Sequence, residues 1–372
     1  MNIVIPTIDY PPIEGGIGTL TLALSRELAA LGHDVTVVAP RIGDRVAEDA
    51  SEPVQVIRFR GYGLGWLRFF PLLIATRPHL RNADIILGIN VAYGGIIGLL
   101  SRRPYLVFAY AYEFLKFSDT RWVANLLRRV YQNATTIVAI SQYTREQLIA
   151  FGAPEDRIEI CHPGATLPES AGDDSVSTIR RRHVLSDGPI ILSVGRLIAR
   201  KNQIALIEAM PAILDHHPDA MLVLAGRGPM LSPISRRAGD LGIRDHVALP
   251  GKVDDEELAA LYEAATVFAL PCKDAGDGQV EGFGLVFVEA GAHGKPVVAG
   301  RGGGVDDAVV DGETGLLVDP DDGEAIAEAL LKLLDDPAFA ARAGATGRAR
   351  VEHELNWPTF AAKIAEQCES VR

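Results

Sequence analysis

Short apolar runs alternate with segments whose apolar residues recur at helical spacing along almost the entire chain. Such a run predicts a strand buried on both faces, and the helical spacing predicts a helix with one apolar side. In the N-terminal part, strands are expected at 2–8, 35–39, 54–59, 84–88, 105–109, 136–140 and 158–161, and helices near 19–31, 120–132 and 143–151. Strands that alternate with helices form βαβ units, so we expect a parallel, doubly wound sheet.

The alternation breaks at 166–186, where proline, glycine, aspartate and serine residues precede three consecutive arginines. We interpret this segment as a linker. Beyond it, strands are expected at 190–194, 220–225, 246–249, 267–270, 296–299 and 315–318, and helices near 202–214, 230–241, 255–264, 283–293, 322–335 and 337–352. The predicted domains are therefore 1–168 and 187–355, both Rossmann-like, with an amphipathic C-terminal helix over 357–370 that packs back on the first.

One apolar segment, residues 61–74, has two interpretations. It combines glycine and aromatic residues with a single basic residue, which is typical of a segment that enters a membrane interface. It is equally typical of a core helix with a glycine-rich approach, and we favour the core helix.

Composition and charge narrow the class of protein. A chain of 372 residues that is 48% hydrophobic suits two well-buried domains, and its net charge of −12 argues against a nucleic-acid partner. Residues 58–129 nevertheless hold 11 basic and 3 acidic residues. That excess fits contact with an anionic membrane or an ordinary solvated face, and both interpretations stay open.

The cysteine count and the N-terminus indicate a compartment. Three widely spaced cysteines suggest a reducing environment, and the first residues lack the basic and long apolar regions of a signal peptide. No apolar run approaches the roughly 20 residues that a membrane span needs. We expect a cytoplasmic protein, with any peripheral membrane contact at the inner face of the plasma membrane.

The stretch 278–291 has the pattern of a ligand site. Glu281 lies just before a predicted helix and Glu289 in its second turn, with Gly284 between them. A helix N-terminus that glycine leaves open attracts phosphate, and carboxylates suit sugar or ribose hydroxyls. Taken by themselves, however, these acids fit better as caps of a surface helix, and the rest of the chain has to decide.

Other loops supply groups for a diphosphate. Arg196 and Lys201 straddle the turn after strand 190–194, where ligands gather in open α/β sheets. Glycines follow the first strand at 15–18 and a later strand at 302–304. No metal site is evident, because the nine histidines form no pair at metal spacing and Asp319-Pro320-Asp321 reads as a helix start.

Taken together, these motifs resemble glycosyltransferase family 4, a large family of retaining enzymes with the GT-B fold. The resemblance rests on Gly-Gly-Ile-Gly at 15–18, Gly-Arg-Leu with Arg196 and Lys201, Glu281-Gly-Phe-Gly with Glu289, and the glycine-rich stretch 302–318. It runs from the first strand to the last helix in the family's order. The stretch 271–290 is most similar to bacterial enzymes that mannosylate phosphatidylinositol lipids.

The resemblance implies a fold and a donor site. It implies two domains that face a central cleft, with Gly16 and Gly18 approaching the donor diphosphate by their backbone. Arg196 and Lys201 would neutralise the diphosphate as it leaves, Glu281 would face the donor sugar, and Glu289 would bind the ribose. The backbone N–H groups of Phe283, Gly284 and Leu285 would meet sugar hydroxyls or phosphate. The family uses no metal, and the sugar nucleotide is its substrate rather than a cofactor.

The acceptor side departs from the family pattern. Many relatives have His-Gly-x-Asp/Glu after a strand in the first domain, whereas this chain has Tyr110-Ala111-Tyr112-Glu113. We place Tyr110 and Glu113 on the acceptor or sugar side. A tyrosine can hydrogen-bond a hydroxyl but is a poor base at neutral pH, which affects acceptor activation more than donor binding.

We expect a glycosyltransferase that moves a sugar from a nucleotide-diphosphate sugar, GDP-mannose or a UDP-sugar, to a hydroxyl of a lipid, glycan or small molecule. Two alternatives share the diphosphate site. One is a sugar-nucleotide epimerase or hydrolase on the same fold. The other is a partner protein that binds sugar nucleotides without catalysis, an idea that Tyr110 motivates.

Overall fold

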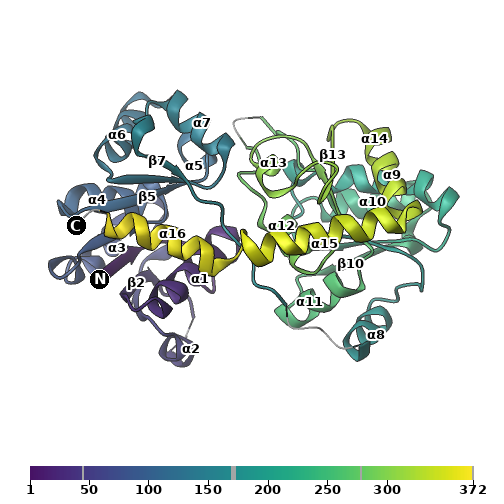
Figure 1. Ribbon diagram of the computed structural model, residues 1–372, viewed down its shortest axis with the longest axis horizontal. Coiled ribbons are helices and arrows are strands. Elements are labelled where there is room, and N and C mark those ends of the chain that lie inside the picture. The colour runs from purple at the N-terminus through teal and green to yellow at the C-terminus, as the bar shows by residue number, and fades with distance from the viewer. Residues whose placement is uncertain (44–45, 169–172, 277–278, 371–372) are drawn as a thin grey trace. The chain divides into compact units, whose positions relative to one another are not determined.

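The chain forms two units. A computed structural model describes residues 1–43, 46–168, 173–276 and 279–370. Unit 1 comprises Met1–Pro163 and Trp357–Arg372, and unit 2 comprises Gly164–Asn356 (Figure 1). Each unit has its own parallel sheet with helices on both faces, which is the doubly wound arrangement that the sequence predicts.

Within the described residues, unit 1 contains a seven-stranded sheet in the order β3-β2-β1-β4-β5-β6-β7. Its strands are β1 (Asn2–Pro6), β2 (Asp34–Pro40), β3 (Gln55–Phe59), β4 (Ile85–Gly88), β5 (Tyr105–Ala109), β6 (Thr136–Ala139) and β7 (Ile158–Ile160). The central strands β4, β5 and β6 are buried along their whole length, which explains why they read as continuous apolar runs. The strand order reverses direction between β1 and β4.

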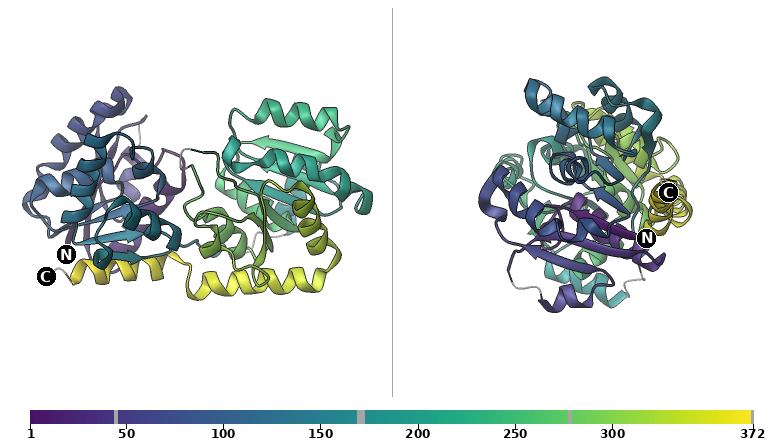
Figure 2. Two further views of the ribbon diagram at one scale, coloured as in Figure 1. Left: turned by 90° about the horizontal axis from the view of Figure 1, so that it is seen from above. Right: turned by 90° about the vertical axis from the view of Figure 1, so that its left-hand side faces the viewer.

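Helices cover both faces of this sheet. They are α1 (Gly16–Ala30), α2 (Val46–Ser51), α3 (Phe69–Thr76), α4 (Ile96–Ser101), α5 (Tyr112–Leu115), α6 (Arg121–Asn133), α7 (Gln142–Phe151) and α16 (Trp357–Glu369), with short turns η1 (Tyr62–Arg68) and η3 (Val91–Gly95). α16 returns from the end of unit 2 and packs beside α1 (Figure 2). Its buried Phe360 lies edge-on to Phe108 of β5, with ring centroids 6.4 Å apart.

Unit 2 repeats the design with six strands among its described residues, in the order β10-β9-β8-β11-β12-β13. The strands are β8 (Ile190–Val194), β9 (Met221–Ala225), β10 (Val247–Gly251), β11 (Val267–Leu270), β12 (Val297–Gly300) and β13 (Gly315–Val318). The helices are α8 (Asp173–Arg182), α9 (Gln203–His216), α10 (Leu231–Asp240), α11 (Asp255–Ala264), α12 (Leu285–Ala292), α13 (Val305–Ala308), α14 (Gly323–Asp335) and α15 (Pro337–His353). Here the strand order reverses between β8 and β11.

Three expectations need correction. α1 begins at Gly16 rather than near residue 19, because Gly15, with φ 139°, ends the turn and lets the helix start within the glycine motif. The segment 166–186, expected to be a linker, contains α8, whose Ile179 is buried and which packs on α11. Part of this segment, 169–172, lies outside the described residues.

The third correction concerns residues 61–74, which we expected to form a core helix. η1 and α3 bury Leu72 but leave Trp66, Phe70 and Ile74 exposed by 75%, 51% and 72%. Phe70 and Ile74 are four residues apart on α3 and therefore lie one helical turn apart on its outer side. None of the described helices is both long and apolar enough to cross a membrane.

The backbone is strained at Ala111, a buried non-glycine residue with a positive φ angle. It links β5 to α5 with φ 75° and ψ −65°, and it is fully buried. An L-residue with a Cβ atom adopts this turn conformation at a cost of about 1–3 kcal/mol. The fold therefore forces this position into a conformation that glycine would adopt more readily.

We predict that Ala111→Gly leaves the free energy of unfolding within about 0.5 kcal/mol of wild type or raises it, because relief of strain offsets the lost methyl group and the added chain entropy. Ala109→Gly, at an equally buried position in β5, should lose about 1–2 kcal/mol. Urea denaturation followed by tryptophan fluorescence measures both, since all three tryptophans lie in unit 1. Equal losses of unfolding free energy in the two variants would show that the backbone of Ala111 is not strained.

Candidate active site

The best-defined polar cluster of unit 2 lies where its strand order reverses. The loop after β8 carries Arg196, Arg200 and Lys201, and the loop after β11 carries Glu281. Parallel strands bring their carboxyl ends to one edge, and the two neighbouring strands at the reversal point leave a crevice there. Topology therefore joins residues about 80 positions apart in the chain.

Glu281 forms the centre of this cluster. Its Oε2 atom accepts from Lys201 Nζ at 2.6 Å and from an Arg200 Nη at 2.9 Å. Burial by itself would raise the pKa of Glu281, but the charges of Lys201 and Arg200 outweigh it and hold that pKa below its usual range. In turn, Glu281 outweighs the effect of burial on Lys201 and raises the pKa of the ammonium group. Glu281 and Lys201 are therefore both ionised at neutral pH.

The backbone of Glu281 is also fixed. Its carbonyl oxygen accepts from Gly304 N–H at 2.8 Å. A Cβ atom on Gly303 would lie 2.3 Å from the same carbonyl oxygen, and Gly303 has φ 62°, so glycine is required there. The glycine triplet 302–304 thus supports the loop that carries Glu281.

The surroundings of Glu281 and Arg196 differ from those that the sequence predicts. Glu281 was expected to face the donor sugar; it is held by two cations through Oε2, and Oε1 has no hydrogen-bond partner among the described residues. Arg196 is exposed, and its guanidinium forms no hydrogen bond or ion pair with the part of the chain that the structure describes. Sequence reasoning missed Arg200, which stands beside Lys201 in the loop and shares its carboxylate.

The helix after Glu281 begins as the sequence predicts. Gly284, with φ 91°, is the residue before α12, and a Cβ atom there would lie 2.4 Å from the Phe287 ring. The neighbouring residues Phe283 and Leu285 flank this turn, but the Phe283 side chain is buried in the core and only its backbone remains a candidate for ligand contact. The positive end of α12 therefore lies next to the Glu281 cluster.

Glu289 lies in the second turn of α12. Its Oε2 accepts from the Tyr262 hydroxyl at 3.1 Å. Burial raises the pKa of Glu289, while the Tyr262 hydrogen bond and the charge of Lys201 oppose that rise. Glu289 thus lies on the helix that begins just after the loop that carries Glu281.

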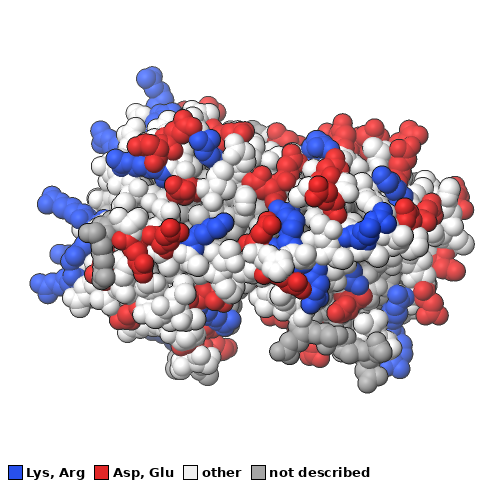
Figure 3. Space-filling view, in the orientation of Figure 1, with Lys and Arg blue, Asp and Glu red and all other residues white. Residues whose placement is uncertain are grey.

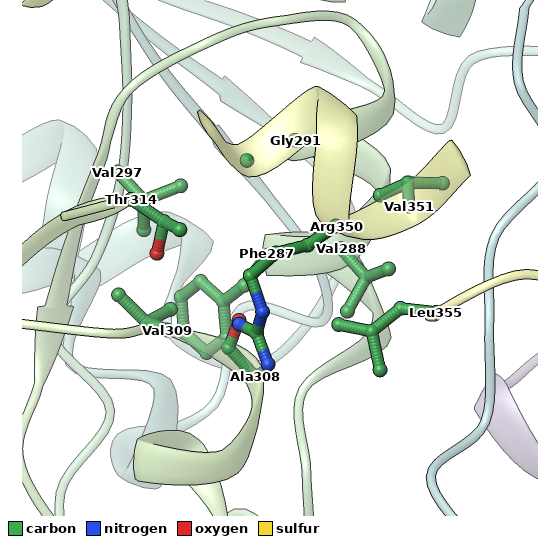
Figure 4. Close-up of a pocket in the computed structure, with 11 residues that line it drawn as sticks. Phe287, Val288, Gly291, Val297, Ala308, Val309, Thr314, Arg350, Val351 and Leu355 are labelled. Carbon is green, nitrogen blue, oxygen red and sulfur yellow. The ribbon is translucent and has the colours of Figure 1, made fainter. Parts of the chain in front are cut away.

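A cavity among the described residues of unit 2 lies at a different place. Figure 4 shows it between α12 and α15, lined mainly by apolar side chains. Arg350 reaches across it and donates to the carbonyl oxygens of Ala308 and Asp307 at 3.0 and 3.1 Å. Neither Glu281 nor Glu289 lines it, so it is a packing space behind α12 and not the donor site.

In unit 1, the glycine motif forms the start of α1. Gly16 is its first residue and is exposed, whereas Gly18 is buried, and a Cβ atom on Gly18 would lie 2.8 Å from the Ile13 carbonyl oxygen. The motif therefore serves both a close turn and an open helix N-terminus, which agrees with a backbone that approaches a ligand.

Tyr110 and Glu113 lie together after β5. Glu113 Oε1 accepts from the Tyr110 backbone N–H at 2.8 Å. The Glu113 Oε2 atom and the hydroxyls of Tyr110 and Tyr131 are buried without a hydrogen-bond partner among the described residues. Burial raises the pKa of Glu113 to about 7. This carboxyl is therefore about half protonated near neutral pH.

Sequence reasoning missed two further residues of unit 1, Asp9 and Asn90. They follow β1 and β4, the pair at which this strand order reverses, and Asn90 Nδ2 donates to Asp9 Oδ2 at 3.1 Å. Burial raises the pKa of Asp9, and Asn90 opposes the rise. The signal that could have found them is their position at the carboxyl ends of these two strands.

Asp319 and Asp322, in and just after the Asp319-Pro320-Asp321 stretch, accept hydrogen bonds from the backbone near the start of α14. Asp319 Oδ1 accepts from Asp321 N–H at 3.0 Å, and Asp322 Oδ1 accepts from two backbone N–H groups of α14, also at 3.0 Å. The interpretation of this Asp-Pro-Asp stretch as a helix start is confirmed.

Two doubly wound units, one with a carboxylate and two cations at its reversal point, are the architecture that the GT-B fold predicts. Comparison with known proteins agrees. The family model described as Glycosyltransferase Family 4 matches residues 14–167, and the model described as Glycosyl transferases group 1 matches residues 175–350.

The chain is also similar to individual proteins over its whole length. It is 34% identical to the GDP-mannose-dependent alpha-(1-6)-phosphatidylinositol monomannoside mannosyltransferase of Mycolicibacterium smegmatis, over 97% of this chain and 96% of the relative. HepE from Anabaena, solved with UDP and glucose, matches with a TM-score of 0.83 at 22% identity, covering 100% of both chains. Sucrose-phosphate synthase from Thermosynechococcus elongatus matches with a TM-score of 0.81 at 25% identity, covering 100% of this chain and 98% of the other.

The chain therefore belongs to glycosyltransferase family 4, within the glycosyl transferases group 1. The predicted fold class, the family and the enzyme class are confirmed.

We predict that Glu113→Gln makes unit 1 less sensitive to pH. Because folding raises the pKa of Glu113 from 4.5 to about 7, its contribution to stability is complete below pH 4.5 and is lost as pH rises through 7. Wild type should therefore lose on the order of 1–3 kcal/mol between pH 5 and 8 that the glutamine variant keeps.

Urea denaturation at several pH values, followed by tryptophan fluorescence, measures this difference. Glu159→Gln, at an exposed position in β7, should follow wild type at every pH. Parallel stability–pH curves for wild type and Glu113→Gln would refute a raised pKa.

Proposed function

We propose that the protein is a retaining, metal-independent mannosyltransferase that transfers mannose from GDP-mannose to a hydroxyl of a phosphatidylinositol-type glycolipid. The relative at 34% identity supports this donor and acceptor, since the similarity covers both units. The observation that carries the proposal is Glu281, buried between Lys201 and Arg200 at the reversal point of unit 2. It is a fixed charged group set where a sugar diphosphate would bind.

The charges suit a diphosphate. Lys201, Arg200 and Glu281 sum to one positive charge, and the exposed Arg196 in the same loop adds a second. The guanidinium of Arg196 would form a fork with two phosphate oxygens, and Lys201 would add a point charge. Negative charge grows on the diphosphate as its bond to the sugar breaks, so cations held in place beforehand stabilise the transition state.

Each acid has a separate role in this proposal. Oε1 of Glu281 would accept a hydrogen bond from a sugar hydroxyl, while Oε2 stays with the cations. Glu289 would bind the ribose. The bond between the anomeric carbon and the phosphate oxygen breaks, the acceptor oxygen bonds to that carbon on the same face, and the acceptor proton passes to the departing diphosphate.

In unit 1, Tyr110 and Glu113 would lie on the acceptor side, and Gly16 and Gly18 would approach the diphosphate. The proton step described above requires no base from this pair, which agrees with a tyrosine at position 110. Neutral or half-protonated groups suit an acceptor hydroxyl, because they donate as well as accept hydrogen bonds.

The exposed apolar side chains of η1 and α3 in unit 1 are suited to peripheral membrane binding. Trp66, Phe70 and Ile74 protrude from η1 and α3. Lys and Arg side chains protrude from unit 1 near α3 and α4 (Figure 3), where Arg77 and Arg102 are exposed. Apolar side chains beside basic ones bind the interface of an anionic bilayer. We therefore include peripheral contact with the cytoplasmic face of an anionic membrane.

We predict that Lys201→Ala and Arg196→Ala each reduce mannosyl transfer at least about 100-fold, because each removes a charge that stabilises the leaving diphosphate. Transfer from GDP-mannose to phosphatidylinositol mannoside in vesicles measures it. Arg236→Ala, an exposed arginine on α10, is the matched control and should keep wild-type turnover.

Two outcomes would contradict the proposal. Near-wild-type turnover in Lys201→Ala would show that this cluster does not stabilise the leaving diphosphate. A larger thermal shift with UDP-glucose or ADP-glucose than with GDP-mannose would overturn the donor, since the best donor stabilises the fold most. Release of free mannose or an epimerised sugar nucleotide without an acceptor would indicate a hydrolase or epimerase instead.

We predict that Trp66→Ser combined with Phe70→Ser weakens binding to vesicles of phosphatidylinositol and phosphatidylcholine at least about tenfold, because each side chain loses the burial of a large apolar surface. Co-sedimentation with vesicles measures the affinity. Leu31→Ser, at a half-exposed position at the end of α1, should bind as wild type does. Equal binding by the double variant would refute this membrane surface.

A further inference from the structure

We propose that Tyr262 positions Glu289 for the ribose of the donor nucleotide, an inference that rests on the proposed function. Tyr262 lies on α11 and Glu289 on α12, and neither the motifs nor the spacing of the sequence pointed to the tyrosine. Three observations support it: the hydrogen bond between the two side chains, the close packing around the Tyr262 ring, and the Oε1 atom of Glu289 that remains as an acceptor.

The hydroxyl of Tyr262 has two acceptors within reach. It lies 3.1 Å from Glu289 Oε2 and 3.5 Å from the Val286 carbonyl oxygen. A hydroxyl donates one proton, and the 3.1 Å contact with the carboxyl oxygen has the better hydrogen-bond length of the two. The proton of Tyr262 therefore goes to Glu289.

The ring of Tyr262 has little freedom to move. It stacks on His293 with centroids 4.9 Å apart and an interplanar angle of 16°, and Phe268 packs on it at 5.8 Å. Only 2% of the residue is exposed. Burial lowers the pKa of His293 to about 4, so the stacking partner is uncharged at neutral pH. Packing thus fixes where the hydroxyl points.

Glu289 keeps enough free hydrogen-bond acceptor positions to bind the two hydroxyls of a ribose. A carboxylate has about four acceptor positions, and Tyr262 occupies one of them. The Oε1 atom accepts no hydrogen bond from the residues that the structure describes. Two neighbouring hydroxyls need two acceptors in a fixed plane, and a carboxylate already held by Tyr262 loses less freedom when they bind.

The test compares affinities for nucleotides with and without the two hydroxyls. Calorimetry measures binding of GDP and of 2′,3′-dideoxy-GDP to wild type, Tyr262→Phe and Glu289→Ala, with UDP and its dideoxy form as a second pair. Tyr262→Phe keeps the ring and its stacking and removes only the hydroxyl. Tyr105→Phe is the matched control, because it removes a buried tyrosine hydroxyl that donates to Val130 in unit 1.

We expect wild type and Tyr105→Phe to prefer the nucleotide with both hydroxyls by about tenfold or more, since two hydrogen bonds to the carboxyl group are lost otherwise. Tyr262→Phe should reduce that preference to about threefold or less and should bind dideoxy-GDP as wild type does. A weaker affinity for both nucleotides in equal proportion would indicate a merely structural role and overturn the proposal.

Two other results also overturn it, and they separate it from the proposed function. If Glu289→Ala loses the preference and Tyr262→Phe keeps it, Glu289 binds ribose without help from Tyr262 and the proposed function stands. If wild type binds none of the four nucleotides, the proposed donor itself is wrong.

Discussion

The buried contact of Glu281 with Lys201 and Arg200 is the interaction on which the site of unit 2 depends. A buried carboxylate without a partner would be costly, and two buried cations without one would be more so. Together they leave a small positive charge at a fixed place. The sheet topology makes this possible, because only neighbouring strands at the reversal point bring these two loops together.

The two units have the same kind of sheet topology, but the pKa values of Glu281 in unit 2 and of Asp9 and Glu113 in unit 1 shift in opposite directions. In unit 2 the cations lower the pKa of Glu281, so the acid stays ionised and serves as a counterion. In unit 1 burial raises the pKa values of Asp9 and Glu113, so these acids are closer to neutral. A site with cations suits a diphosphate, whereas neutral or weakly acidic groups suit hydroxyls. One fold thus supplies two kinds of binding surface.

The helices around the site are placed by small residues and caps. Gly284 permits the turn that starts α12, and the Gly302–Gly304 segment supports the Glu281 carbonyl oxygen. On the far side of α12, Gly291 lies against Gly347 of α15, which allows the two helices to approach closely. Side-chain chemistry at the site therefore rests on positions where a Cβ atom would not fit.

The sequence by itself determined most of the architecture. Fully buried strands such as β5 and β11 read as continuous apolar runs, and glycines such as Gly152 with caps such as Ser141 ended or began helices where the patterns changed. Arg196 and Lys201 were found because they follow a predicted strand, and Glu281 and Glu289 because they lie at the start of a predicted helix. Local patterns suffice for features that local geometry controls.

Tertiary structure alone decided how those residues act. Arg200 is a second partner of Glu281 beside Lys201, and its side chain could equally have faced solvent. Only packing brings Tyr262 to Glu289. The apolar segment at η1 and α3 lies partly exposed although its composition suits a core, because the sheet offers room for only one of its faces. Contacts between distant segments depend on the fold as a whole, and a linear pattern does not contain them.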